Sequence, residues 1–386
     1  MEKPVWMICI THMFLEIYLL IQVALIPVIA SEFQLSLVEA SLVASVPSLV
    51  MLLMNIPCGF LADHFSTNHL LFSSMLIEGF SALLISQTNS FWTLVLGVSL
   101  MKIASPVYHI SGLSQISRFA RKPKRIGRAI GLHNALGSLG AAVGVVSLAV
   151  FLATLGWRWS YLFWALPILV WGFIVLTSPQ LRTKRTEQAK IEKRGSFLKF
   201  SLILSVPLLI FLVSMGAREV GSTGISTFMT TYFVSVRRLS ETTASLIFGL
   251  GPFLGIAGSL SGGYMTERAG AKKALSWGVL ACVLSLSILS LMTQVYLLAL
   301  VYLVYAFFSN SVWSPMNTIV ATVTPESERG LSYSIYFFTE GLIASFAPTL
   351  VAGVIELSDV WFAFPFSIAF MILGLTILQF LPRLNE

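Results

Sequence analysis

The 386-residue chain is 56% hydrophobic and only 11% charged, and its mean hydropathy is +0.86. Soluble domains hold about 25% charged residues, so the composition excludes that class and indicates an integral membrane protein. The net charge of +7 reflects 24 Lys and Arg against 17 Asp and Glu. Cys9, Cys58 and Cys282 all lie inside apolar segments, so we expect no disulfide framework, no metal centre and no cofactor.

Hydropathy predicts an all-α chain that crosses the membrane twelve times. A bilayer core of about 30 Å needs about 20 apolar residues in a helix. The first run follows Lys3, is long enough to span and lacks a small-residue cleavage pattern, so we interpret it as a membrane helix rather than a signal peptide. The predicted spans are 6–30, 38–62, 70–86, 91–117, 126–152, 161–176, 200–236, 242–265, 274–291, 295–322, 331–355 and 360–381.

An internal repeat divides the chain into two halves. The stretch from Leu35 to Asp63 recurs 204 positions later without a gap, and both copies end in GxxxD or GxxxE, at Asp63 and Glu267. Such self-similarity is typical of duplicated architectures. We therefore predict an N-terminal six-helix bundle over 1–178, a basic linker over 179–199 and a C-terminal six-helix bundle over 200–386, the two bundles being pseudo-symmetric.

The basic residues set the predicted orientation, because Lys and Arg gather in cytoplasmic loops. Of the 24, 19 fall on the side that holds both termini, three on the other side, and Lys102 and Arg218 inside spans. Both termini are therefore expected in the cytoplasm. The positive charge follows from topology, which argues against a nucleic-acid partner; the expected partners are a small-molecule substrate, protons and the lipid bilayer.

Two six-helix halves with GxxxD at the end of the second helix of each half resemble the major facilitator superfamily. In that family the loop motif reads GxxxDRxGRR or similar. The second copy, GYMTERAGAKK at 263–273, keeps it, whereas the first, GFLADHFSTNH at 59–69, lacks the basic residues. The resemblance implies a cytoplasmic gate that contains Asp63, Glu267, Arg268, Lys272 and Lys273. We predict that this gate depends on Glu267 at least as much as on Asp63.

Within that superfamily the sequence is most similar to the fosmidomycin-resistance group of exporters. The likeness rests on HMFLE at 12–16, PVYHISGLSQISRF at 106–119, GRAIGLHNALGSLGAAVG at 127–144 and GWRW from Gly156. One difference is that exporters of the superfamily often carry GPxxGG late in the fifth helix, whereas Val145 follows Gly144 here. The resemblance therefore favours export, although this motif is absent.

Several ionisable residues lie inside predicted spans, where a charge near the bilayer centre costs at least about 3 kcal/mol. His12 and Glu16 share a face of the first span, and Lys102 and His109 share a face of the fourth. The resemblance implies that the first, fourth, seventh and tenth helices line a central cavity. The predicted substrate or proton site comprises His12, Glu16, Lys102, His109, His133, Arg218, Glu219, Asn310, Trp313 and Glu340. The alternative is that these groups only hold the bundles together, and for Glu78 and His133 the sequence leaves the two roles open.

These features predict a monomeric, multi-pass secondary active transporter of the cell membrane that works by alternating access and exports a small organic or amphipathic compound in exchange for protons. Glu16 is the predicted main proton carrier, because it lies about 15 Å into its span, near mid-bilayer; Glu340 is the second candidate. The alternatives are proton-coupled uptake of an organic anion such as a carboxylate, and a membrane receptor or scaffold that moves nothing. The sequence has no phosphate-binding loop, HExxH or nucleophile elbow, so we expect no enzyme.

Overall fold

The computed structural model describes residues 2–19, 21, 25, 28–29, 32–34, 37–119, 123–181 and 205–382, and within these ranges it contains helices and no strand. Nine helices in the described part of the chain are long and apolar enough to cross a membrane, and 46–62 forms a shorter apolar helix. The predicted linker is described only at η1 (Pro179–Leu181), so the rest of that prediction lies outside the described residues.

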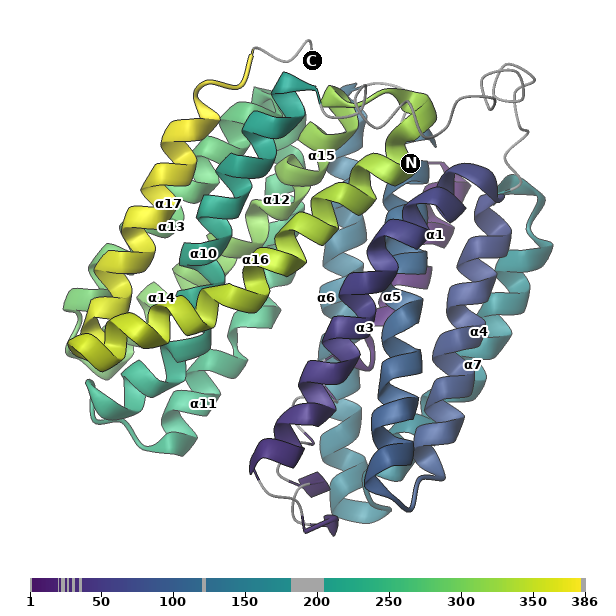
Figure 1. Cartoon of the computed structure of the whole chain (residues 1–386), viewed down its shortest axis with the longest axis horizontal. Helices are drawn as coiled ribbons and strands as arrows, with labels where there is room; N and C mark the ends of the chain where they lie inside the picture. The colour runs from purple at the N-terminus through teal and green to yellow at the C-terminus, as the bar shows by residue number, and fades with distance from the viewer. Residues whose placement is uncertain are drawn as a thin grey trace. The chain divides into compact units, whose positions relative to one another are not determined.

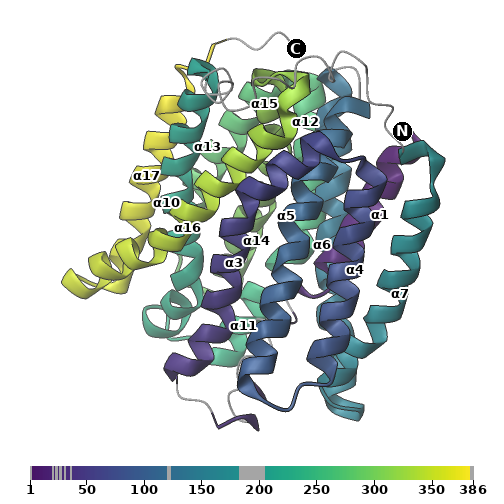
Figure 2. The ribbon, with the colours of Figure 1, turned by 45° about the vertical axis from the view of Figure 1, so that its right-hand side comes forward.

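The chain divides into two compact units (Figure 1). Unit 1 comprises Met1–Ala120, Leu136–Gly195 and Glu326–Ile335. Its helices are α1 (Lys3–Glu16), α3 (Leu37–His64), α4 (Thr67–Ser86), α5 (Phe91–Phe119), the greater part of α6 (Pro123–Thr154) and α7 (Arg158–Thr177). Within unit 1, α4 packs against both α5 and α7, and α3 packs against α5, as both views show (Figures 1 and 2).

Unit 2 comprises Arg121–Ala135, Ser196–Pro325 and Tyr336–Glu386. Its helices are α10 (Val206–Ser235), α11 (Glu241–Gly249), α12 (Gly251–Ala269), α13 (Ala271–Leu291), α14 (Val295–Ser311), α15 (Trp313–Val323), α17 (Ala363–Leu378), most of α16 (Arg329–Leu357) and the short η4 (Val360–Phe362); η3 (Glu326–Glu328) belongs to unit 1. Within unit 2, α10 runs along α17, and α14 packs against α12 and α13. Division of the chain at 178 and 200 remains a prediction, because α6 and α16 each contribute residues to both units.

The first predicted span, 6–30, is interrupted after Glu16, where α1 ends in a turn. Two predicted spans of unit 2 are also interrupted, each beside a proline. The span predicted over 242–265 is divided at Leu250 into α11 and α12, and Pro252 stands at the start of α12. The span predicted over 295–322 is divided at Val312 into α14 and α15, with Pro315 in the first turn of α15. Proline has no backbone N–H to donate, so a helix restarts at it more easily than it continues through it.

The glycines at four-residue intervals in α6 bring its backbone against α1. A Cβ added at Gly140 would collide with the carbonyl oxygen of Met13, and one added at Gly144 with that of Ile17. The backbones of α6 and α1 therefore approach closely at these glycines. It occurs where α1 ends, since Glu16 is the last helical residue and the N–H of Ile17 turns to the carbonyl oxygen of Phe14 at 3.4 Å.

Candidate functional site

Three of the predicted site residues meet at the C-terminal end of α1. The Nε2 atoms of His12 and His109 lie 3.0 Å apart, and each lies 3.3 Å from Oε1 of Glu16. Their side chains are 7%, 21% and 12% exposed, respectively. Helical spacing places Glu16 one turn after His12, whereas His109 comes from α5. We call these residues the His–Glu–His triad.

Neighbouring groups fix the orientation of both imidazoles. His109 Nδ1 lies 3.0 Å from the carbonyl oxygen of Ser105 and 3.2 Å from its hydroxyl. A carbonyl can only accept, so Nδ1 carries a proton, and in the neutral ring Nε2 then presents its lone pair to the triad. The His12 ring stacks on Tyr108 at a centroid distance of 5.4 Å, and the Tyr108 hydroxyl donates to the carbonyl oxygen of Ile8 at 2.6 Å. Gly137 of α6 leaves the room that the His12 ring occupies, because a Cβ there would collide with it.

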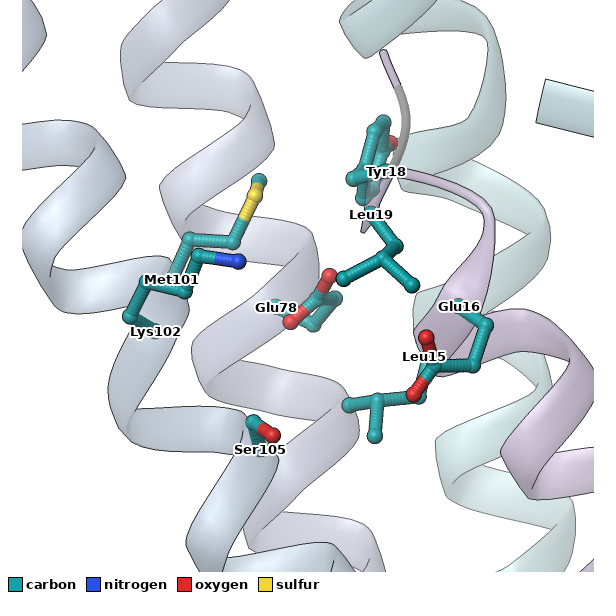
Figure 3. Close-up of a pocket in the computed structure, with 8 residues that line it drawn as sticks. All are labelled: Leu15, Glu16, Tyr18, Leu19, Glu78, Met101, Lys102 and Ser105. Carbon is teal, nitrogen blue, oxygen red and sulfur yellow. The ribbon is translucent and has the colours of Figure 1, made fainter. Parts of the chain in front are cut away.

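A small cavity opens beside Glu16 and brings two more ionisable residues to the site (Figure 3). Glu78 from α4 and Lys102 from α5 line it, and their charged ends point into the space that Glu16 also borders. The remaining lining residues are Leu15, Tyr18, Leu19, Met101 and Ser105. Its volume of about 30 Å³ has room for roughly two water molecules, which is too little for an organic solute. The geometry places Glu78, whose role the sequence left open, with the candidate site residues.

Unit 2 holds a different buried cluster, built around Arg218 on α10. Arg218, which is 3% exposed, donates from Nη1 to Glu219 Oε2 at 2.8 Å and from Nη2 to the Ser222 hydroxyl at 3.2 Å. The Glu219 carboxylate also accepts from the Thr223 hydroxyl. The ion-pair partner of Arg218 is thus the adjacent Glu219. We call Arg218, Glu219 and Glu340 the Arg–Glu–Glu cluster.

The second carboxylate of this cluster comes from α16. Glu340 accepts a hydrogen bond from the Tyr336 hydroxyl at 3.2 Å, and both residues line a hollow of about 10 Å³ together with Leu212, Met215, Gly216 and Thr339. The guanidinium of Arg218 lies 6.0 Å from the ring centroid of Trp313 on α15, within cation–π range. Trp313, one of the predicted site residues, is therefore in contact with Arg218.

The remaining predicted site residues lie apart from these two clusters. His133 is buried in the part of α6 that belongs to unit 2, with its Nδ1 3.0 Å from Asn134 Oδ1. Asn310 donates to the carbonyl oxygen of Ala306 at 2.9 Å and packs against Gly255. Both contacts are local and resemble ordinary packing in a helix bundle.

The predicted gate residues have separate partners. Glu267 Oε2 lies 2.7 Å from Nε of Arg128, which the sequence analysis counted only as a basic loop residue. The Arg268 guanidinium lies over the Tyr264 ring at 5.1 Å. Lys272 donates to the last carbonyl oxygens after α17, those of Gln379 and Leu381, at 2.9 Å and 2.5 Å, where a cation is favoured by the helix dipole.

Two further gate predictions have simpler outcomes: Lys273 is exposed, and the side chain of Asp63 lies outside the described residues. The sequence signal that could have indicated Arg128 as a gate residue is its position directly after Gly127, near the start of a helix with glycines at regular intervals. Both Gly127 and Gly131 pack closely against Gly263 or its neighbour Thr266 on α12, so this part of α6 lies where Glu267 can be reached.

The family model described as Major Facilitator Superfamily matches residues 7–348, with a second match over 238–384. The chain belongs to the Major Facilitator Superfamily. This confirms the predicted all-helical fold and identifies a multi-pass membrane transporter, not an enzyme. Among solved structures, the outward conformation of the transporter FucP superposes with a TM-score of 0.80 at 12% identity, covering 99% of both chains. A bacterial homologue of the iron transporter ferroportin superposes with a TM-score of 0.78 at 16% identity, covering 98% of this chain and 99% of the other.

Two curated relatives are similar in sequence. A probable nitrate transporter, NarT of Staphylococcus carnosus, is 23% identical over 368 residues, which are 94% of this chain and 91% of the relative. A nitrite extrusion protein of Bacillus subtilis is 29% identical over 135 residues, which are 35% of this chain and 33% of the relative. Neither name refers to fosmidomycin, so that part of the resemblance stays a prediction.

Proposed function

We propose that this transporter works by alternating access and exports a small organic or amphipathic compound in exchange for protons. One observation carries the proposal: among the described residues, each unit places two buried or half-buried carboxylates beside one cation. In unit 1 these are Glu16, Glu78 and Lys102, and in unit 2 they are Glu219, Glu340 and Arg218. When both carboxylates of a cluster are ionised, its Lys or Arg is charged and the histidines of unit 1 are neutral, the cluster holds one negative charge in excess.

An excess charge at membrane depth is costly, so it favours the binding of a cation. A proton bound to one carboxylate of each cluster would leave that cluster neutral. A carrier whose loaded form is neutral changes conformation at lower cost than its charged, empty form, which is the basis of coupling in alternating access. Ion pairs in hydrophobic cores often contribute little to the stability of a fold. Because the family consists of transporters, proton coupling explains these clusters better than a purely stabilising role does.

In this proposal the residues have distinct roles. Glu340, hydrogen-bonded to Tyr336, is the proton carrier of unit 2, and Glu16 holds the corresponding charge in unit 1. Arg218 is held by Glu219 and becomes available to a solute when Glu219 is released. The cytoplasmic gate is formed by Glu267 with Arg128, and the further candidate gate residues are Asp63, Arg268, Lys272 and Lys273. The further candidates for the substrate or proton site are His12, Lys102, His109, His133, Asn310 and Trp313.

The direct test is transport by purified protein in proteoliposomes. Fosmidomycin is the first compound to try, because the exporters that the sequence resembles are named for resistance to it, followed by a panel of antimicrobials and organic anions that stabilise the protein in a thermal-shift screen. We expect an imposed pH gradient to drive accumulation of a stabilising compound, and a protonophore to prevent it. Accumulation that is indifferent to the gradient would refute proton coupling. Binding without any transport would favour the receptor alternative.

A second candidate function is transport of a small inorganic anion such as nitrate or nitrite. The names of the two curated relatives support it, and so does the buried guanidinium of Arg218, which could grip an oxyanion by its planar fork. The earlier alternative, uptake of a carboxylate compound, uses the same group. Nitrate and acetate should then stabilise the wild-type protein but not Arg218→Gln, and uptake assays under opposed pH gradients would give the direction of transport.

A further inference from the structure

We propose that the His–Glu–His triad is a binding site for a divalent transition-metal ion such as Zn²⁺, Co²⁺ or Fe²⁺. The proposal goes beyond the transport function and does not depend on it. Cysteine spacing predicted no metal site, but these ligands come from α1 and α5, and His12 and His109 are 97 positions apart in the sequence. Sequence spacing therefore could not indicate that they meet.

The distances between the three ligand atoms match those around a tetrahedral ion. Bonds of about 2.0–2.1 Å from a tetrahedral ion to imidazole nitrogen and carboxylate oxygen place neighbouring ligand atoms about 3.3 Å apart. The three distances in the triad are 3.0, 3.3 and 3.3 Å. One ion on the axis of the triangle would contact all three atoms.

The surroundings prepare the ligands for an ion. His109 directs Nδ1 to the carbonyl oxygen of Ser105, so in the neutral ring Nε2 is the nitrogen that can bind a metal, and such a contact to a carbonyl oxygen is usual for a metal-binding histidine. Tyr108 and Gly137 hold the ring of His12 in place. Because α1 ends at Glu16, the negative end of its helix dipole also faces the site.

A cavity borders one of the three ligands, Glu16, and a fourth ligand could reach the ion from that side. The cavity has room for roughly two waters, and the charged groups that face it from the packed helices are Glu78 and Lys102, which compensate each other. Sites with three protein ligands and one open position exchange their fourth ligand readily. An anion at that position would balance the charge of the bound ion and Glu16.

The donor set decides the class of ion. Two imidazoles and one carboxylate suit Zn²⁺ and neighbouring first-row ions, whereas Mg²⁺ and Ca²⁺ prefer oxygen ligands only. The repeat also confines the site to unit 1. The shift of 204 positions carries His12, Glu16 and His109 to Gly216, Val220 and Trp313, none of which binds a metal through its side chain.

The test uses the full-length protein, purified with a tag other than polyhistidine and stripped with a chelator. Titration with Co²⁺ followed by absorption spectroscopy, and with Zn²⁺ by calorimetry, measures stoichiometry and affinity. We expect one ion per chain, with Co²⁺ giving the intense visible bands of a tetrahedral site. His12→Ala and His109→Ala should each weaken binding by at least about 100-fold. The matched control is His69→Ala, which removes a histidine in the first turn of α4 that bonds to Ser66, and it should bind as the wild type does.

One further variant keeps the test decisive if an alanine variant fails to fold. His109→Cys replaces one ligand by another, so it should retain Co²⁺ and add a thiolate charge-transfer band. Absence of stoichiometric binding by the wild type, or equal binding by the wild type and both alanine variants, would overturn the proposal. Neither result bears on transport, which the pH-gradient assay measures separately with chelator present.

Discussion

The two units carry the same repeat but bury different chemistry. The 204-residue shift that aligns Asp63 with Glu267 also carries Trp157 to Trp361, so the framework is retained. At the site, however, it carries Glu78 to Cys282 and His109 to Trp313. Unit 1 gathers imidazoles and carboxylates at the end of a short helix, whereas unit 2 anchors a guanidinium on the long α10. The comparison teaches that duplication preserved the helix packing while the ionisable groups diverged, and it suggests different ligands for the two units.

The largest expected effect concerns Arg218, the single cation of the unit 2 cluster. Arg218→Ala would leave Glu219 as a buried, uncompensated carboxylate, which typically costs about 3–5 kcal/mol. We expect a large loss of thermal stability and no transport. Arg218→Lys keeps the charge but loses the planar guanidinium, so this variant should fold normally but transport poorly. Normal transport by both variants would place the site of unit 2 elsewhere.

The carboxylates of the two units can be compared directly by neutral replacement. Glu340→Gln and Glu16→Gln both mimic a protonated carboxyl, so we expect each to abolish accumulation driven by a pH gradient while solute binding or exchange remains measurable. Proteoliposome assays with and without the gradient distinguish the two activities. If Glu16→Gln still concentrates solute with an unchanged pH dependence, the sequence prediction that Glu16 is the main carrier is wrong, and Glu340 alone carries the proton.

Substitutions of the gate residues in the two copies of the loop motif should reduce the transport rate to different extents. Glu267 pairs with Arg128 at 2.7 Å, so Glu267→Ala and Arg128→Ala should reduce transport at neutral pH by similar factors, and Glu267→Ala should be at least as harmful as Asp63→Ala. Initial rates at matched expression measure this. An inactive Asp63→Ala beside a normal Glu267→Ala would reverse the predicted order.

The smallest effect concerns two arginines that cap equivalent helices. In unit 1, Arg158 donates to the carbonyl oxygen of Thr88 after α4 at 2.9 Å and to Glu32 at 2.6 Å. In unit 2, Arg237 donates to the carbonyl oxygen of Ser290 in the last turn of α13 and to the hydroxyl of Tyr232. Only the unit 1 cap contains a carboxylate, so only this cap should respond to acid.

The sign of that response follows from the pKa of Glu32. Its partial burial would raise the pKa, but hydrogen bonds from Arg158 and Trp157 and the charge of Arg158 outweigh burial and hold the pKa below its ordinary value. The ion pair therefore stabilises the fold fully above about pH 4.3, the ordinary value, and less as the pH falls through the lowered pKa. With the carboxylate 37% exposed, the contribution should stay below about 1 kcal/mol.

Melting temperatures across a pH series test this. The difference between the wild type and Glu32→Gln should shrink as the pH is lowered from 7 towards 3. The matched control, Arg237→Gln, removes a cation whose acceptors are neutral, so its difference from the wild type should not change over the same range. A pH-independent effect of Glu32→Gln would show that Glu32 stabilises the loop without its charge.

The sequence by itself determined the membrane class, the positions of the spans and the internal repeat, because these depend on hydropathy and spacing summed along the chain. For example, the ends predicted for the spans at 70–86 and 91–117 lie within three residues of α4 and α5. It also indicated that His12 and Glu16 share a helix face and that Lys102 and His109 share another. These are local properties of a helix, fixed by 3.6 residues per turn.

Only the tertiary structure decided which side chains meet. His109 completes the triad, Glu78 reaches the cavity with Lys102, and Arg128 pairs with Glu267, each across segments far apart in the sequence. The reason is that the rotation of a helix about its axis, and the depth at which it packs, depend on contacts with its neighbours. Here the contact of Gly140 and Gly144 with the end of α1 fixes where Glu16 lies, and no local pattern in either helix specifies that pairing.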